Sequence, residues 1–151
     1  MLSVREFLAS DYDAVLEIDV EAQREYRGPS WDAMQGEERS RLLMTKRELV
    51  GAYVASGFAL VAEEAGAIRG FLFAWPLPDG RLVVVALAVR QGARRRGIAG
   101  ALYRHLSGKA RDGGVAEVRA LISEDNVASQ RLHRSLGFAL RRRVEAVLEI
   151  A

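Results

Sequence analysis

The sequence predicts an α/β fold built on a mixed central sheet. Short runs rich in Val, Leu, Ile and Phe alternate with stretches in which apolar residues recur every three or four positions, the spacing of a helix face. Tight turns join the runs between residues 58 and 89, which favours antiparallel strands. A Gly-rich turn, a helix and another apolar run then follow in order, which is typical of a parallel crossover.

The first third of the chain is predicted to form one strand and two helical regions. Leu2–Phe7 is the strand, and a helix follows over residues 10–26 with Ser10 as its N-cap residue. Gly28-Pro29-Ser30 interrupts this helix, because Gly and Pro disfavour helix interiors. A second helical region is expected from about Glu37 to Ala55, ended by Gly57.

Three strands are predicted next. Phe58–Glu63 and Ile68–Trp75 flank a short turn, and Pro78-Asp79-Gly80 turns the chain into Leu82–Val89. The last of these segments is apolar throughout rather than alternating. A strand that is covered on both faces has this composition, so we expect Leu82–Val89 to lie inside the sheet rather than at its edge.

The remaining elements complete the crossover. A helix is expected to follow the Gly-rich segment 91–100 and to run to about residue 111. Val115–Ile122 is predicted as a second buried strand, Val127–Leu136 as a helix ended by Gly137, and Phe138–Ile150 as a strand with a charged middle. The sheet is therefore expected to be mostly antiparallel, with one parallel pair, and to be flanked by about four helices.

The composition suits a single domain over residues 1–151, since half of the residues are hydrophobic and 28% are charged. The chain has no Cys, which excludes disulfides, thiolate catalysis and Cys-based zinc sites. The two His residues lie in no cluster with metal-ligand spacing, so no metal is expected. Neither a signal peptide nor a membrane-spanning apolar run is visible, which predicts a cytoplasmic protein without membrane contact.

The Gly-rich segment is the strongest candidate for a ligand site. A strand that leads through such a turn into a helix leaves several amide N–H groups without helical partners, and these form an anion site. Gly97 and Gly100, with Ala99 between them, remove side chains that would keep a phosphate from the backbone. The adjacent Arg94-Arg95-Arg96 adds positive charge. The alternative is that the glycines only shape a turn and the arginines only face solvent.

Two familiar phosphate motifs do not fit this segment. Gly92 and Gly97 match the first half of a P-loop, but Ile98 and Ala99 stand where Lys and Ser or Thr are needed. The dinucleotide fingerprint G-x-G-x-x-G is also absent. An NTPase and a dinucleotide-binding enzyme are therefore disfavoured.

Two motifs resemble those of the GNAT superfamily of acyl-CoA-dependent N-acetyltransferases. Arg94-Arg95-Arg96-Gly97-Ile98-Ala99 matches its Q/R-x-x-G-x-G/A signature, and Leu87-Ala88-Val89 is similar to the strand end before it. The segment from Asn126 to Phe138 resembles a second motif, N-x-x-A/S-x-x-L-Y/H-x-x-L-G-F. The resemblance implies a GNAT fold in which the parallel strands splay apart and acetyl-CoA, the acyl donor, lies between them.

The resemblance also implies the site residues. Backbone groups of Leu87 and Val89 are expected to pair with pantetheine, and the Leu87 N–H to polarise the thioester carbonyl. The amides from Arg95 to Gly100 are expected to hold the pyrophosphate. The cofactor-binding residues implied in this way are Leu87, Val89, Arg94, Arg95, Arg96, Gly97, Ile98, Ala99, Gly100, Asn126 and Ser129.

His133 and Leu87 are the catalytic residues that the resemblance implies. Many family members carry Tyr where this chain has His133, and this variant resembles the phosphinothricin acetyltransferase branch. A His can protonate a departing thiolate or act as the base. The alternative is a structural role on the helix surface, but the motif position of His133 favours the functional role. Asn126 has a structural alternative as well, as an N-cap residue.

The general base and the acceptor stay open at this level. Glu117 lies on the strand before Asn126 with unfavourable spacing, which leaves water relays or a carboxylate of the first helix. Glu17, Glu21 and Glu25 form a stripe on that helix, most simply a solvated face or else a site for a cationic amine.

The expected activity is acetyl transfer to a primary amine of a small molecule or an amino-acid-like acceptor. The alternatives are a protein N-terminal or side-chain amine as acceptor, and a non-catalytic acyl-CoA-binding sensor. A nucleic-acid partner is not expected, because the two Arg triplets come without an aromatic platform or recognition motif. The sequence leaves the oligomeric state open, with a homodimer as one option.

Overall fold

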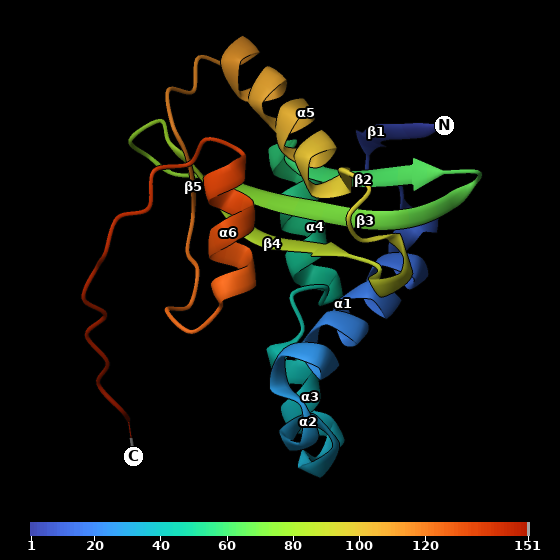
Figure 1. Cartoon of the computed structure of the whole chain (residues 1–151), viewed down its shortest axis with the longest axis vertical. Helices are drawn as coiled ribbons and strands as arrows, with labels where there is room; N and C mark the ends of the chain where they lie inside the picture. The colour runs from blue at the N-terminus through green and yellow to red at the C-terminus, as the bar shows by residue number, and fades with distance from the viewer. Residues whose placement is uncertain (151) are drawn as a thin grey trace. The chain divides into compact units, whose positions relative to one another are not determined.

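The sheet has five strands in the order β1-β2-β3-β4-β5 (Figure 1). Neighbouring strands are antiparallel from β1 to β4, and β4 and β5 are parallel. The strands are β1 (Leu2–Glu6), β2 (Ala59–Glu64), β3 (Ala67–Pro76), β4 (Leu82–Val89) and β5 (Val118–Ala120). This is the mixed sheet with a parallel pair that the sequence predicts, and β4 lies inside it as expected.

The computed structural model describes residues 1–150, which form two units, Met1–Leu121 and the residues from Ile122 onward. The first unit contains the sheet and most of the helices. Its helices are α1 (Tyr12–Arg27), α2 (Pro29–Ala33), α3 (Gly36–Leu42), α4 (Arg47–Ser56) and α5 (Ile98–Asp112), with short 3₁₀ turns at Ala9–Asp11 and Gln91–Ala93.

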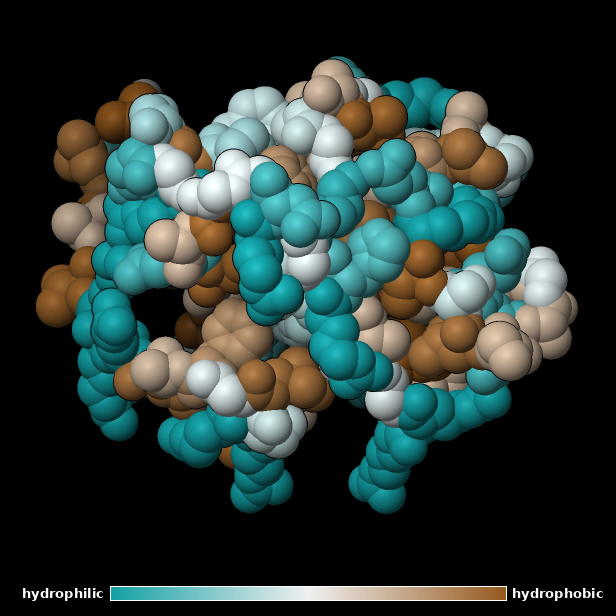
Figure 2. Space-filling model, turned by 90° about the horizontal axis from the view of Figure 1, so that it is seen from above, coloured by the Kyte–Doolittle hydropathy of each residue, from teal (hydrophilic) through white to brown (hydrophobic). Residues whose placement is uncertain are grey.

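The helices of the first unit cover both faces of the sheet (Figure 1). Phe71 and Phe73 belong to a core shared with buried residues of α1 and α4. Because side chains alternate along a strand, Leu72 faces the opposite side, where α5 packs. Leu102 and Leu106 of α5 are fully buried, whereas hydrophilic residues form much of the surface seen in Figure 2.

The helices before β2 differ from the sequence prediction in three ways. The first helix is interrupted at Gly28 as predicted, since α1 ends at Arg27, but residues 29–33 form the short helix α2, because Pro29 stands at a first helical position that needs no amide hydrogen. The predicted helix Glu37–Ala55 is two helices, α3 and α4. Ser10 is not the N-cap of α1, because that helix begins at Tyr12 with Asp11 before it. Gly57 ends α4 in the left-handed conformation, as predicted.

A long-range contact explains the division between α3 and α4. The carboxylate of Asp19 on α1 accepts hydrogen bonds from the amides of Met44 and Thr45 and from the Thr45 hydroxyl. Because these two amides donate to Asp19, they are not used for the backbone hydrogen bonds that a continuous helix would need. Burial raises the pKa of Asp19 although these donors act in the opposite direction.

Strand β4 contains a bulge. Phe73 pairs with Ala86 and the next residue of β3, Ala74, pairs with Val84, so Val85 has no partner of its own on β3. An inserted residue bends a strand and reverses the alternation of side chains beyond it. Val85 and Ala86 consequently both pack on the side of α1 and α4.

The second unit consists of α6 (Val127–Ser135) and an extended segment. The strand predicted over Phe138–Ile150 is wrong, since residues 138–150 form no helix or strand. A strand exists only when a second strand pairs with it, and this segment pairs with none in the described part of the chain. The strand predicted over Val115–Ile122 is shortened to β5 for the same reason, because β4 pairs with only three of its residues.

Candidate functional site

The parallel strands β4 and β5 diverge. Their pairing is confined to Leu82–Val84 opposite Val118–Ala120. Beyond Val84 strand β4 continues to Val89 without a partner on that side. The carboxyl-terminal half of β4 therefore presents an open edge, as the predicted splay requires.

The direction of the β4 backbone follows from one hydrogen bond. The amide nitrogen of Arg90 donates to the carbonyl oxygen of Arg69 at an N···O distance of 2.8 Å, which is normal for such a bond. In an antiparallel ladder every second residue shares this direction, so Ala88 and Ala86 also bond toward β3. The N–H and C=O groups of Leu87 and Val89 point the opposite way, into the open edge. Both residues predicted to pair with pantetheine thus have backbone groups that a ligand can reach.

A row of unsatisfied amides leads from β4 into α5. Within residues 1–150, no amide from Arg94 to Gly100 makes a hydrogen bond of normal geometry to another protein group. The N-cap residue of α5 is Gly97, and no side chain caps the helix. These donors lie at the positive end of a helix of 15 residues, which makes them an anion site.

Two backbone conformations shape this row of amides. Gly97 has φ of 74°, and a Cβ added there would meet no other atom within 4 Å, so the space beside this residue is open. Arg95 has φ of 63°, which is rare for a residue with a side chain. Such strained positions concentrate at functional sites because the surrounding structure must enforce them.

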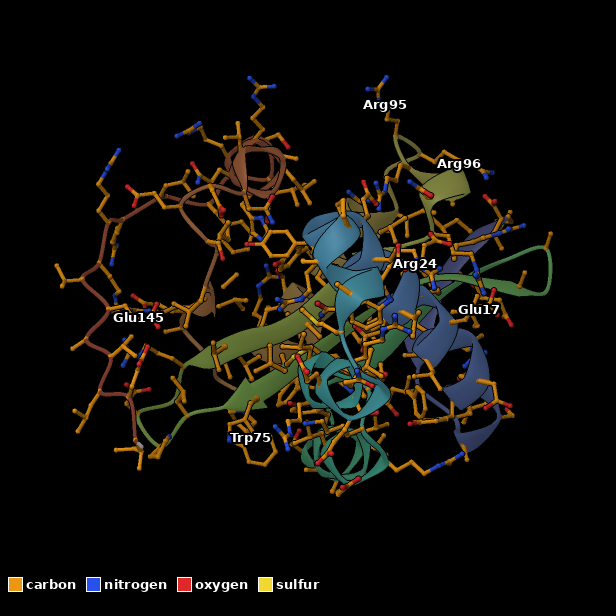
Figure 3. All side chains as sticks on the ribbon, turned by 90° about the horizontal axis from the view of Figure 1, so that it is seen from below. Glu17, Arg24, Trp75, Arg95, Arg96 and Glu145 are labelled. Atoms are coloured by element: carbon orange, nitrogen blue, oxygen red, sulfur yellow. The ribbon has the colours of Figure 1, made fainter. Side chains whose placement is uncertain are left out.

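The three adjacent arginines have different surroundings. Arg94 forms an ion pair with Glu25 of α1, and Arg96 forms one with Glu64 of β2. Arg95 has no ion pair with any residue from 1 to 150, and Figure 3 shows its side chain extending outward from the loop. Of the triplet, only Arg95 therefore has an uncommitted charge.

The acidic stripe on α1 holds the loop before α5. Glu17 pairs with Arg90, Glu21 accepts a hydrogen bond from the amide of Gln91, and Glu25 pairs with Arg94. The Arg94 guanidinium holds the pKa of Glu25 below its ordinary value. The stripe is therefore neither an idle solvated face nor an open site for a cationic amine, because it fixes residues 90–94.

The second unit positions the remaining predicted residues. Asn126 is the N-cap of α6, and its Oδ1 accepts a hydrogen bond from the Ser129 amide at 3.1 Å. The side chain of His133 is buried, with Nδ1 lying 2.7 Å from the Ser129 carbonyl oxygen and the ring edge-on to Phe138. A contact between Nδ1 and a carbonyl requires a proton on Nδ1, which makes Nε2 the nitrogen for any proton transfer.

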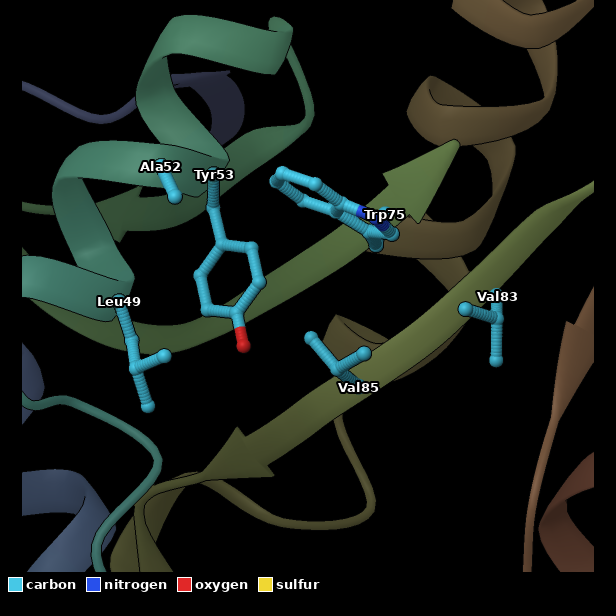
Figure 4. A pocket seen from close by; sticks show the side chains of 6 residues that line it. All are labelled: Leu49, Ala52, Tyr53, Trp75, Val83 and Val85. Carbon is cyan, nitrogen blue, oxygen red and sulfur yellow. The ribbon is translucent and has the colours of Figure 1, made fainter. Parts of the chain in front are cut away.

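An apolar groove opens beside β4 in the first unit, with a volume of about 320 Å³ (Figure 4). Helix α4 forms one wall, and β3 and β4 form the floor. The lining residues are Leu49, Ala52, Tyr53, Trp75, Val83 and Val85. Trp75 lies edge-on to Tyr53 and is 40% exposed. Trp31 lies outside this groove and is buried, with the Arg39 guanidinium over its ring.

A family model described as a protein of unknown function, DUF1999, matches residues 2–151. The chain belongs to the DUF1999 family. No curated protein matches its sequence.

Solved structures identify the fold of this DUF1999 protein. It is similar to the PaiA N-acetyltransferase from Thermoplasma acidophilum in complex with coenzyme A, with a TM-score of 0.80, 13% identity and coverage of 93% of this chain and 91% of that chain. A GNAT-family acetyltransferase from Staphylococcus aureus Mu50 has a TM-score of 0.77 and 14% identity, with coverage of 95% of this chain and 87% of that chain. The ribosomal-protein-alanine N-acetyltransferase from Brucella melitensis has a TM-score of 0.70 and 27% identity, with coverage of 89% of this chain and 83% of that chain. The fold is therefore the GNAT fold, as predicted.

Neither a metal cluster nor a membrane helix is found in the described part of this DUF1999 protein. No group of three or more His, Asp and Glu side chains in residues 1–150 is arranged to hold a metal ion. No helix over the same residues is long and apolar enough to span a bilayer.

Two features of this DUF1999 site are not predicted by the sequence. The bulge at Val85 leaves no local signal, because it depends on the register of β3 against β4. The partners of the acidic stripe lie about seventy residues along the chain, as in the Arg94–Glu25 pair with a separation of 69. The regular spacing of Glu17, Glu21 and Glu25 places them on one helix face, but it does not identify the residues with which they interact.

Proposed function

We propose that this DUF1999 protein is an acetyl-CoA-dependent N-acetyltransferase that acetylates a primary amine of a small molecule. The observation that carries the proposal is the combination of the open edge at Leu87 and Val89 with the unsatisfied amides from Arg94 to Gly100. The first supplies backbone partners for an extended amide-containing chain, and the second supplies donors for a diphosphate. Coenzyme A contains both groups, in that order.

Each predicted cofactor residue has a role in this arrangement. The amides of Ile98, Ala99 and Gly100 hold the pyrophosphate at the start of α5, and Gly97 leaves room for it. Arg95 supplies a cation to the phosphates, whereas Arg94 and Arg96 fix the loop through Glu25 and Glu64. Arg94 and Arg96 therefore contribute amides to the cofactor rather than guanidinium groups.

The reaction is a direct transfer. The nitrogen of a neutral amine attacks the thioester carbonyl carbon, the C–S bond breaks, and the acetyl group ends in an amide. The amine loses one proton and the thiolate gains one, so acetyl-CoA and amine give an acetamide and CoA. The Leu87 N–H points into the open edge, where it stabilises the oxyanion of the tetrahedral intermediate, an effect of about 3 kcal/mol in other acyl-transfer enzymes.

His133 is proposed as the acid for the thiolate, in keeping with the phosphinothricin-acetyltransferase-like motif. The contact of Nδ1 with the Ser129 carbonyl orients the ring. Ser129 supports this position through its carbonyl, and its own amide bonds to Asn126. We expect His133→Phe to lower the acetylation rate much more than it weakens acetyl-CoA binding, as measured by steady-state kinetics and calorimetry. An unchanged turnover would remove His133 from the mechanism.

The proposal is tested by titrating the purified protein with CoA in a calorimeter and by following thiol release from acetyl-CoA. The amine panel contains simple amines, amino acids, aminoglycosides and peptides with free N-termini. CoA binding with thiol release on small amines supports the proposal. Release on peptides alone moves the acceptor to proteins, binding without release indicates a sensor, and absence of CoA binding overturns the proposal.

A further inference from the structure

The apolar groove beside β4 has the properties of a small-molecule site. Its volume of about 320 Å³ lies at the lower end of the range that ligand pockets occupy, roughly 300–1,000 Å³. Trp75 exposes an indole face to it, and Leu49 on the opposite wall is also partly exposed. An exposed Trp beside an apolar wall is unfavourable in water, so occupation of the groove by an apolar group stabilises it.

The groove lies close to the place where the acetyl group is proposed to arrive. Val85, the bulge residue, lines the groove and precedes Leu87 by two positions on the same strand. Two residues of extended strand span about 7 Å. A molecule of two parts, with an apolar end among Trp75 and Leu49 and a reactive end at Val85, therefore fits between the groove and the Leu87 amide.

The charges around the groove exclude a polycation. None of its lining residues is acidic. The carboxylates of α1 that offered a cationic site from the sequence are held by Arg90, Gln91 and Arg94. A second ammonium group would therefore lose water without gaining a counter-charge, which is strongly unfavourable.

Tyr53 supplies a hydroxyl group to the groove. Its hydroxyl makes no hydrogen bond to any other residue from 1 to 150, and Figure 4 shows it pointing into the groove next to Val85. A phenol in this position can bond to a neutral amine as donor or acceptor. Burial raises the pKa of Tyr53, so the hydroxyl stays protonated at neutral pH and positions the amine rather than deprotonating it.

We propose that the groove binds the acceptor, and that this acceptor is a monoamine carried on an aromatic or similarly sized apolar group, such as an arylalkylamine. The inference rests on the proposed acetyl transfer and adds the class of acceptor. Trp75, Leu49 and Val83 take the apolar group, and the Tyr53 hydroxyl takes the amine at the end of the groove nearest Leu87.

A comparison of amines tests the preference. 2-Phenylethylamine is set against ethylamine, which lacks the ring, and against spermidine, which adds charges. Burial of a ring predicts a KM for 2-phenylethylamine that is about 10–100-fold lower than that for ethylamine. Spermidine is expected to be the poorest of the three. An equal or lower KM for spermidine would overturn the inference.

Variants of the groove provide matched controls. We expect Trp75→Ala to raise the KM for 2-phenylethylamine about tenfold with unchanged CoA affinity. Val54→Ala, on the same helix as Tyr53 but outside the groove, is expected to change neither value. Leu49→Asp adds a carboxylate and is expected to shift the preference toward spermidine. If Val54→Ala and Trp75→Ala behave alike, the groove is not the acceptor site.

A binding measurement separates this inference from the acetyl-transfer proposal. In Trp31→Phe the only Trp is Trp75, so its fluorescence reports the groove directly. Saturable quenching by 2-phenylethylamine but not by spermidine supports the groove even if CoA fails to bind. CoA binding without quenching rejects the groove and leaves acetyl transfer intact. If Trp31→Phe does not fold, calorimetry of the unmodified protein and Leu49→Asp with the same two amines decides the question.

Discussion

Two helices of this protein begin in opposite ways, and the contrast explains where a ligand binds. At α6 the side chain of Asn126 turns back and accepts the amide of Ser129, so the helix start is capped by its own chain. At α5 the corresponding residue is Gly97, which has no side chain to turn back, and the amides before and after it make no such contact. A helix start that is not capped internally keeps its donors for an anion.

The difference between the two helix starts is expected to disappear if α5 is given an N-cap side chain. Gly97→Asp places a carboxylate at the N-cap of α5, and Asp tolerates the left-handed conformation better than most residues. We expect CoA affinity to fall about 100-fold, because the carboxylate occupies the amides and repels phosphate, while the thermal midpoint stays equal or rises. Calorimetry and thermal unfolding measure both. Gly97→Asn, a neutral cap, should lose less affinity, and tight CoA binding by Gly97→Asp would contradict the site.

At the 3₁₀ turn Ala9–Asp11 before α1, the carboxylate of Asp11 bonds back to the preceding chain and not to the first amides of α1. It accepts hydrogen bonds from Arg5 and from the Leu8 amide. Burial alone would raise the pKa of Asp11, but these bonds outweigh it and hold the pKa below its ordinary value. The stabilisation is therefore present above the unfolded pKa of about 3.9 and is lost as pH falls through the folded pKa.

We expect Asp11→Asn to lower the free energy of unfolding by about 2 kcal/mol at pH 7. The deficit should shrink as the pH of the urea denaturation is lowered below about 4, where the unfolded Asp11 takes up a proton, and should disappear as the pH falls through the lower pKa of the native Asp11. Glu63→Gln, which removes the more exposed partner of Arg5, is the control and should cost less. A deficit that is independent of pH would show that charge on Asp11 is not involved.

The cap of α6 can be separated from the proposed cofactor contact of Asn126. Asn126→Ala should lower the free energy of unfolding by about 1 kcal/mol, and Asn126→Ser, which keeps a capping oxygen, by a few tenths. If Asn126 also binds the cofactor through its amide nitrogen, both variants should weaken CoA several-fold. Full CoA affinity in Asn126→Ser would leave Asn126 with the cap alone.

The smallest effect concerns the side chains around the open start. Arg95→Gln should weaken CoA about two- to fivefold, since an exposed cation near phosphate contributes a modest, salt-screened attraction. The loss should diminish at high salt. Arg111→Gln, which removes an exposed arginine at the far end of α5, is the control and should leave affinity unchanged. If both variants lost the same CoA affinity, Arg95 would contribute only to the overall charge of the protein.

The elements that the sequence predicts well are those with local signals. The apolar run Leu82–Val89, the Gly-rich start of α5 and the stop at Gly57 each follow from adjacent residues, and the structure contains all three. The open start at Gly97 also follows locally, because glycine offers no cap. The same reasoning identifies Asn126 as a cap, and the structure shows that contact.

The features that the sequence does not predict depend on distant partners. The division of α3 from α4 comes from Asp19 binding the amide of Thr45, 26 residues along the chain. The pairs of Glu17, Glu21 and Glu25 with the loop before α5 are longer-range still. The segment Phe138–Ile150 has the residues of a strand, but strand composition does not provide the second strand that such a segment needs.

The bulge in β4 depends on the number of residues in the strand as well as on their identity. Before Val85 the even-numbered side chains turn toward α5, and after it the odd-numbered ones do. Deleting Val85 would remove no residue proposed to touch CoA, and it would make Val84 and Ala86 neighbours opposite Ala74 and Phe73, as in a regular ladder, so the amides of Leu87 and Val89 would keep their direction. The bend that the bulge gives β4 where its pairing with β5 ends would be lost. When DUF1999 sequences are aligned, a one-residue gap at this place therefore marks a chain in which β4 and β5 are expected to stay paired for longer and to close the edge that the thioester needs, even if every motif residue is retained.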